Sequence, residues 1–317
     1  MQIVLYAAAV LLGVMVGTLA PGATDLFELS VWPVLVVLLY VTFLQVHIRA
    51  LPLALRDVGF LVAALAGNFV VAPALVWALL YVIPVSAAVR VGVVLVLLAP
   101  CTDWFTSFTH IGRGDTRLAV AFTPLLLVVQ AATLPFYLWL LADVGFGALP
   151  FEPLVLALIF VILLPLVAAG FTQEVRQLRL AGERAAHAVV PLLAVALFLV
   201  AASQATAVRS AGDDLARAVA IFVAYAVVAG LVAKVLASVG RLSLGAGRTL
   251  AFNLGTRNSF VVLPIALTLP EAFALAAPVV AVQTLVELTA MLAYVRWVPK
   301  RLFPDRQDRI AEPRTTV

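Results

Sequence analysis

The sequence predicts an all-α integral membrane protein, and three observations lead to this fold class. Apolar residues make up 65% of the 317 residues and charged residues only 11%, whereas soluble domains average roughly 45–50% and about 25%. The apolar residues come in continuous runs of about twenty, the length that a helix needs to cross a bilayer. The basic residues are distributed unevenly among the connectors. Most of the chain is therefore expected to lie in lipid.

Runs of this length define about ten spanning segments with short polar connectors. They cover residues 2–20, 31–48, 58–82, 89–108, 118–141, 153–170, 187–206, 215–237, 249–269 and 275–297. The first segment lacks a basic region before its apolar run, so we interpret it as a retained span and not as a signal peptide. Residues 171–184 mix charged and apolar side chains, which predicts a short interfacial helix between the sixth and seventh segments.

The Lys and Arg residues provide an independent check, because they collect on the cytoplasmic side of membrane proteins. Only Arg90, Arg209 and Arg217 lie beside the opposite ends of the segments, and Arg257 lies inside one. All the others of the 20 basic residues follow even-numbered segments, lie at their ends or belong to the tail. We therefore predict a multi-pass plasma-membrane protein with both termini cytoplasmic. The basic tail is expected to face anionic lipid and not nucleic acid.

Ten spans divide into two halves of five, residues 1–152 and 153–298, followed by a basic cytoplasmic tail at 299–317. Because each half has an odd number of spans, the second half must insert upside down relative to the first. The sequence thus predicts two inverted five-helix repeats. The fourth and ninth segments occupy the same place in each repeat, and a pseudo-two-fold axis would bring them together as crossed helices.

Both of these segments are interrupted by polar residues. The first break is Ala99-Pro100-Cys101-Thr102-Asp103, and the second extends from Asn253 to Ser259. Lipid offers no partner for a freed backbone N–H or C=O, so non-helical backbone persists at membrane depth only where protein buries it or where it lines a cavity. Paired breaks are typical of a transporter's central binding site. The candidate substrate-binding residues are Cys101, Thr102, Asn253, Arg257, Asn258 and Ser259.

Three charged residues within the spans are candidates for an ion pair or for ion coupling. A lone charge at the bilayer centre costs about 2.5–3.5 kcal/mol on insertion scales, so we predict that Asp103 and Arg257 face each other. The pair either holds the crossing together permanently or is opened by a proton or a solute. Glu287 is a third buried charge and a candidate proton carrier, or it is a structural hydrogen-bond acceptor.

Cys101 is the only cysteine. A buried cysteine is usually a small hydrophobe, but a thiol beside a break in a membrane cavity is also a soft ligand that thiophilic metalloids prefer. Both interpretations stay open from the residues alone. Polar side chains in other spans, Asn68, Gln130 and Gln283, are further candidates for the lining of a solute path.

Other classes of function are less consistent with the sequence. The breaks contain no His-rich cluster, no paired metal-ligand motif and no nucleophile beside a base, so we predict no enzyme activity, no cofactor and no metal site. A receptor or scaffold gains nothing from polar breaks at the midplane.

At these residues the chain resembles the bile acid:sodium symporter superfamily, and within it the arsenical-resistance carriers that export arsenite or antimonite. The similar elements are Ala99-Pro100-Cys101-Thr102, Gly114-Asp115 and Gly255-Thr256-Arg257-Asn258-Ser259, the last being similar to a Gly-x-Gln-Asn-Ser stretch of the symporters. The resemblance implies ten spans, a core domain with the crossed helices, a smaller panel domain and alternating access.

The chain also departs from the family pattern. The symporters bind sodium through a glutamate and a glutamine that correspond to Asn253 and Arg257, so a guanidinium at that place argues against sodium coupling. Arsenite carriers have an acidic residue where this chain has Val261. Since Cys101 is retained, the resemblance favours export of a small metalloid, arsenite or antimonite, in exchange for protons. The alternative is an organic-anion carrier in which Arg257 binds a carboxylate or sulfate.

Overall fold

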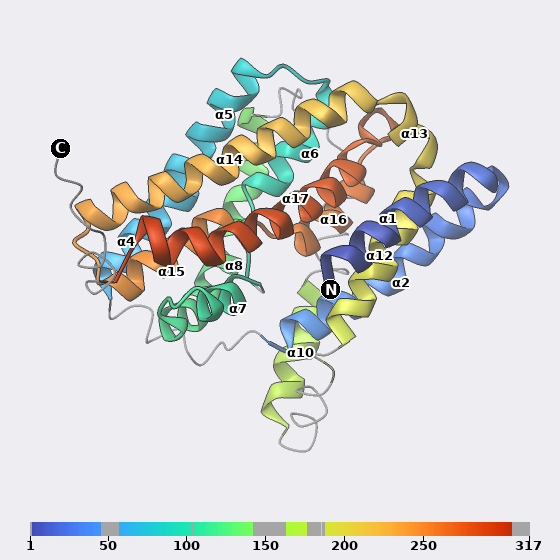
Figure 1. The fold of residues 1–317 in the computed structure, drawn as a ribbon. Helices are drawn as coiled ribbons and strands as arrows, with labels where there is room; N and C mark the ends of the chain where they lie inside the picture. The colour runs from blue at the N-terminus through green and yellow to red at the C-terminus, as the bar shows by residue number, and fades with distance from the viewer. Residues whose placement is uncertain are drawn as a thin grey trace.

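The computed structural model describes residues 2–45, 57–102, 104–141, 163–175, 185 and 188–305. These residues form helices and contain no β-strand (Figure 1). The helices of the first part of the chain are α1 (Gln2–Leu19), α2 (Thr24–Phe43), α4 (Val58–Ala66), α5 (Ala72–Val82), α6 (Ala87–Leu97), α7 (Trp104–Ile111) and α8 (Thr116–Leu141). Those of the second part are α10 (Leu164–Glu174), α12 (Val189–Ser203), α13 (Ala205–Ser210), α14 (Gly212–Val239), α15 (Leu244–Gly255), α16 (Ser259–Leu267) and α17 (Ala276–Trp297).

The predicted fold class is confirmed. Five helical stretches are long and apolar enough to cross a membrane: Pro21–Phe43, Val58–Val82, Thr116–Leu141, Gly212–Val239 and Glu271–Leu302. The third predicted span is one continuous stretch, in which a π-helical turn at Gly67–Val71 (η3) joins α4 to α5. The predicted fourth and ninth spans are each two short helices with a break between them.

The structure differs from the sequence prediction in two places. Helix α2 begins at Thr24 and not near residue 31, because acidic residues such as Asp25 in its first turn are stabilised at a helix N-terminus. Residues 171–174, predicted to belong to a separate interfacial helix, form the last turn of α10, and Val175 is extended. The rest of that predicted helix, residues 176–184, lies outside the described residues.

Helices α1, α2, α10 and α12 pack side by side as one group (Figure 1). Small residues allow α1 and α12 to approach closely, as in small-xxx-small motifs of membrane helices. A Cβ added at Gly13 would lie 2.8 Å from Ala201 Cβ, and one added at Gly17 would lie 2.8 Å from Ala205 Cβ. The group takes two helices from each predicted half of the chain, an arrangement compatible with inverted repeats. The exact division at residues 152 and 298 stays a prediction.

A second group contains α4 to α8 and α14 to α17 (Figure 1). Helix α17 packs against α6, α14 and α16 within this group and also contacts α1 and α12 of the other. Its approach to α6 requires a glycine, since a Cβ at Gly92 would lie 2.8 Å from Val279 Cβ and 2.9 Å from the carbonyl oxygen of Ala276. The unbroken helix α17 thus packs directly against α6 and α16, one half of each broken span.

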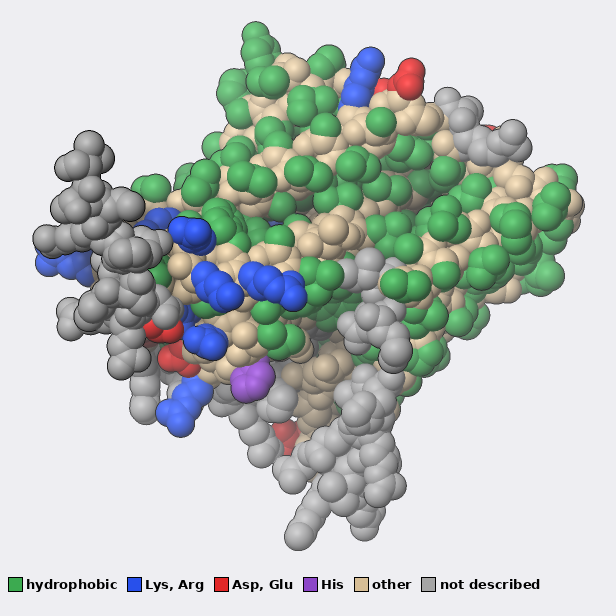
Figure 2. Space-filling model, viewed as in Figure 1, with side chains coloured by type: hydrophobic (Ala, Val, Ile, Leu, Met, Phe, Trp, Pro, Cys, Tyr) green, Lys and Arg blue, Asp and Glu red, His purple; other side chains and the backbone are tan. Residues whose placement is uncertain are grey.

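Connectors that the sequence assigns to one membrane face lie together. At one end, Asp115 N donates to Gly245 O (3.2 Å), and buried Arg248 donates to the carbonyl oxygens of Arg113 and Phe303. At the other end, Arg217 donates to Pro84 O (3.2 Å). On the face that Figure 2 shows, Lys and Arg side chains gather mainly on the side where α14 and α17 end, and apolar side chains cover much of the remaining described surface. The cytoplasmic assignment of this end stays a prediction.

Candidate functional site

The two breaks meet and pair through their backbones. Helix α6 ends at Leu97 and α7 begins at Trp104, while α15 ends at Gly255 and α16 begins at Ser259. Between them, Pro100 and Arg257 form an isolated antiparallel bridge. Asn258 N donates to Ala99 O (2.7 Å), and Cys101 N donates to Thr256 O (3.3 Å). Each unwound segment therefore satisfies backbone groups of the other, which the apolar surroundings require.

Asn258 joins the two breaks through its side chain as well. Its Oδ1 accepts a hydrogen bond from Val261 N (3.2 Å) and so caps the N-terminus of α16. Its Nδ2 donates to Thr102 Oγ1 (3.1 Å) in the first break. One buried amide thus fixes both the start of a half-helix and its position against the opposite segment.

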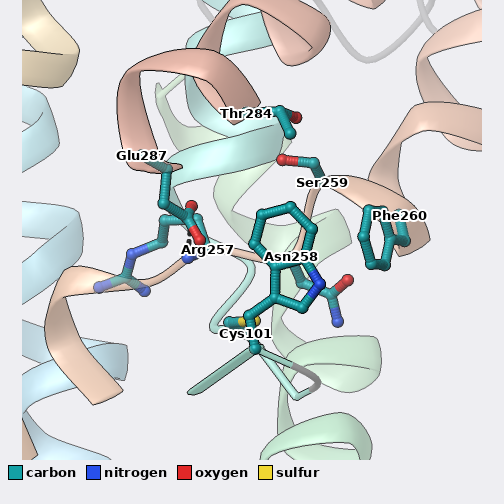
Figure 3. Close-up of a pocket in the computed structure, with 8 residues that line it drawn as sticks. Cys101, Arg257, Asn258, Ser259, Phe260, Thr284 and Glu287 are labelled. Carbon is teal, nitrogen blue, oxygen red and sulfur yellow. Dashed lines mark hydrogen bonds between the residues drawn. The ribbon is translucent and has the colours of Figure 1, made fainter. Parts of the chain in front are cut away.

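Beside the crossing lies a small cavity of about 10 Å³, which is room for about one water molecule. Its lining residues are Cys101, Trp104, Arg257, Asn258, Ser259, Phe260, Thr284 and Glu287. Figure 3 shows Cys101 on the first break, Asn258 on the second, Ser259 and Phe260 at the start of α16, and Thr284 and Glu287 on α17. A thiol, an amide, two hydroxyls and a carboxylate therefore surround this small cavity.

Aromatic residues close this cavity on the side of the four-helix group. Trp104 packs edge-on against Phe260, with ring centroids 5.5 Å apart, and stacks on Tyr6 of α1 at 6.0 Å. Tyr6 is fully buried, and its hydroxyl has no hydrogen-bond partner among the described residues. The stack is thus a direct contact between the two helix groups at the wall of the cavity.

Glu287 is the centre of a buried hydrogen-bond chain. Its Oε2 accepts from the backbone N–H of Arg257 (2.9 Å) and from Gln283 Nε2 (2.7 Å). Gln283 Oε1 in turn accepts from Ser259 Oγ (2.8 Å). The chain connects the carboxylate on α17 to both the unwound segment and the first residue of α16. These hydrogen bonds hold the Glu287 carboxylate at the wall of the cavity.

The Arg257 guanidinium is turned away from Cys101 (Figure 3). Its NH1 donates to Asn68 Oδ1 (3.1 Å), and its NH2 donates to Leu254 O (2.6 Å) and to the hydroxyl of Tyr225. The guanidinium carbon lies 4.8 Å from the centroid of the Tyr225 ring. Oxygen atoms and the face of one aromatic ring thus hold the Arg257 guanidinium. The backbone N–H of Arg257 points the other way and donates to Glu287 beside the cavity.

The residues predicted for substrate binding and for ion coupling separate into three sets. The first set lines the cavity and contains Cys101, Arg257, Asn258, Ser259 and Glu287. Thr102 and Asn253 do not line it, since Thr102 accepts from Asn258 and Asn253 Oδ1 accepts from Asn68 Nδ2 (2.6 Å). Asp103 lies outside the described residues, and its pairing with Arg257 stays a prediction.

Sequence reasoning missed Trp104, Phe260, Tyr6 and Tyr225. The first two directly adjoin the breaks, so their position next to candidate residues was an available signal. Tyr225 is a polar aromatic residue within an apolar helix, where the burial of its hydroxyl requires a partner. Asn68, named only as a candidate lining residue, lies in the π-helical turn η3, and such turns frequently mark functional sites.

The site combines hydrogen-bonding groups with one buried carboxylate, that of Glu287. Within the described part of the chain, no group of three or more His, Cys, Asp or Glu side chains gathers in a way that could hold a metal ion. A helical membrane protein with two broken helices crossing beside a buried polar cavity has the architecture of a solute transporter.

The comparison with known families agrees with this class. Residues 32–212, more than half of the chain, match the model of the Sodium Bile acid symporter family, and the protein belongs to that family. Its members are transporters and not enzymes. The matched residues include the first break but end before the second, whose place in the site comes from the structure. No curated protein matches the chain.

Proposed function

We propose that the protein is a secondary transporter that exports arsenite or antimonite by alternating access in exchange for protons. The observation that supports this most directly is the thiol of Cys101 in a small cavity shared with Asn258, Ser259, Thr284 and Glu287. Thiols are soft ligands for thiophilic elements, and hydroxyl and amide groups suit the hydroxyls of a neutral trihydroxide.

In this proposal Cys101 binds the metalloid directly. A sulfur–metalloid bond forms as one metalloid–oxygen bond breaks, and the departing hydroxide takes the thiol proton as water. The second N–H of the Asn258 amide donates to one remaining hydroxyl, and Ser259 Oγ, whose own proton is donated to Gln283, accepts from the other. The reverse exchange with water releases the solute on the other side of the membrane.

Glu287 is the proposed carrier of the exchanged proton. It is 5% exposed, lies at the cavity and has a hydrogen-bond chain to the residue that begins α16. A buried ionisable residue inside a membrane is by default a functional candidate. Its protonation would weaken the hydrogen bond from the Arg257 N–H and so alter the unwound segment beside the solute.

The proposal places the protein in the plasma membrane with both termini cytoplasmic. Basic residues at the end that contains Arg113, Arg248 and the C-terminal segment support this orientation through the positive-inside rule. Export then moves solute from the end near these residues to the end near Pro84 and Asp214.

An organic-anion carrier is the second candidate. Arg257 contributes to the cavity, and the faces of Trp104 and Phe260 provide apolar surface for a larger ligand. In this alternative the guanidinium would have to leave its present oxygen partners to bind a carboxylate or sulfate. The family match accommodates either solute class.

Flux through Cys101→Ala tests the proposal. Inverted vesicles with and without an imposed proton gradient are offered arsenite, antimonite or an organic anion. We expect the variant to lose metalloid uptake while its membrane level stays at the wild-type value, because a small side chain replaces another. Ser203→Ala is the matched control, since Ser203 is buried and donates only to Val200 O, away from the cavity. Wild-type metalloid flux through Cys101→Ala would disprove the thiol's role.

A further inference from the structure

Oxygen atoms of the protein surround the Arg257 guanidinium in the way that they surround a bound metal cation in other proteins. We propose that Arg257 is a resident cation whose guanidinium assembles the crossing, and that it acts as a positioning residue for the cavity and not as a solute ligand. The inference deepens the proposed transport function. Its decisive measurements, stability and thiol labelling, do not depend on which solute is moved.

Three oxygen atoms from three different elements surround the guanidinium. Asn68 Oδ1 comes from η3, Leu254 O from the last turn of α15, and the Tyr225 hydroxyl from α14. We call these three atoms the oxygen cage. Helix ends leave carbonyl groups without intrahelical partners, and Leu254 O gains donors from both Arg257 and Tyr225. The cation therefore joins elements that no peptide bond holds together.

The residues of the oxygen cage are buried and are held in place by further hydrogen bonds. Arg257 is 2% exposed, Asn68 is fully buried and Tyr225 is 2% exposed. Asn68 is itself fixed, because its Nδ2 donates to Ala64 O (2.9 Å) and to Asn253 Oδ1 (2.6 Å), which orients Oδ1 toward the cation. A planar guanidinium, with five donors in a fixed geometry, suits such a set of acceptors better than a compact ammonium does.

The backbone of the same residue forms the cavity side of this arrangement. Arg257 pairs with Pro100 in the antiparallel bridge, and its N–H donates to Glu287 Oε2. Holding the side chain in the cage therefore fixes the peptide that contacts Glu287 and that precedes Asn258 and Ser259. A cation at the cage thus positions three of the residues that line the cavity.

The direction of the side chain excludes it as a direct solute ligand in this state. Figure 3 shows the guanidinium on the side away from Cys101, and both of its terminal nitrogens donate to protein oxygens. Because the charge is covalently attached, the pocket is assembled without a cation that binds and dissociates.

Chemical rescue tests this assignment. In Arg257→Ala the cage is left without its cation, so we expect a lower unfolding midpoint in detergent and an unwound segment that opens more often. Cys101 is the only thiol of the chain, and its N–H bonds to Thr256 O beside Arg257. Since labelling of a buried thiol follows the population of the open state, maleimide labelling of Cys101 should become about tenfold faster.

Millimolar guanidinium chloride should raise the midpoint of Arg257→Ala, slow its labelling several-fold and restore part of its arsenite flux. Equal choline chloride should do none of these. Arg296→Ala is the matched control, because exposed Arg296 contacts only the Leu292 carbonyl one turn earlier on α17. It should keep the wild-type midpoint and show no response to guanidinium.

Absence of rescue by guanidinium in both stability and labelling would overturn the proposal, and so would equal effects of guanidinium and choline. If Arg257→Ala does not insert, Tyr225→Phe and Asn68→Leu still test the cage, because each removes one acceptor and should accelerate Cys101 labelling. Unchanged labelling in both would refute the assignment. Rescue of stability and labelling without arsenite flux would support the cage and count only against the transported solute.

Discussion

Replacement of Glu287 by an amide or by a leucine separates its structural role from its proposed proton-carrying role. Glu287 Oε2 accepts hydrogen bonds from Arg257 N–H and from Gln283 Nε2. In Glu287→Gln the side-chain carbonyl can still accept both, so only the charge is lost. In Glu287→Leu both donors are left buried without an acceptor.

The number of donors gives the magnitude of the effect. Each buried donor left unsatisfied costs about 1–3 kcal/mol, so Glu287→Leu should lower the free energy of unfolding by about 2–6 kcal/mol. Glu287→Gln exchanges charge-assisted bonds for neutral ones but also removes the cost of burying a charge, and we expect a change within about 1 kcal/mol. The two variants should therefore differ clearly in stability.

Thermal unfolding in detergent measures the stability of both variants, and vesicle flux measures their coupling. We expect Glu287→Gln to equilibrate arsenite down its gradient but to lose accumulation driven by a proton gradient, because the cavity persists without an exchangeable proton. Proton-driven accumulation at the wild-type level by Glu287→Gln would refute the carrier role. Equal stability of the two variants would refute the hydrogen-bond account.

Two further predictions concern packing and topology. Gly17→Leu should destabilise the protein by about 1–3 kcal/mol, the usual cost of overpacking, because any Cβ there meets Ala202 of α12 and Ala205 of α13. An unchanged unfolding midpoint would contradict the close contact, and Gly22→Leu, where a Cβ has open space, is the control. In a Cys101→Ser background, an impermeant thiol reagent applied to intact cells should label a cysteine at Asp213 and not one at Arg113, and the reverse result would overturn the orientation.

The amino-acid sequence by itself determined the membrane class, most spans and the position of both breaks. Those features depend on local properties: the length of an apolar run, the missing donor of Pro100 and the freedom of Gly255. The beginning of α2 was missed because average hydropathy discounts the polar first turn at Thr24 and Asp25, although a helix N-terminus stabilises such residues.

Only the tertiary structure decided what the buried polar residues contact. The partners of the Arg257 guanidinium come from η3, α14 and α15, and those of Glu287 are the Arg257 N–H in the second break and Gln283 on α17. Trp104 meets Tyr6 across nearly one hundred residues of sequence. No periodicity in one segment specifies which face of another helix will lie opposite it, because that depends on how all the helices pack at once. The sequence could therefore predict that the breaks would meet, but not which oxygen atoms would surround the cation between them.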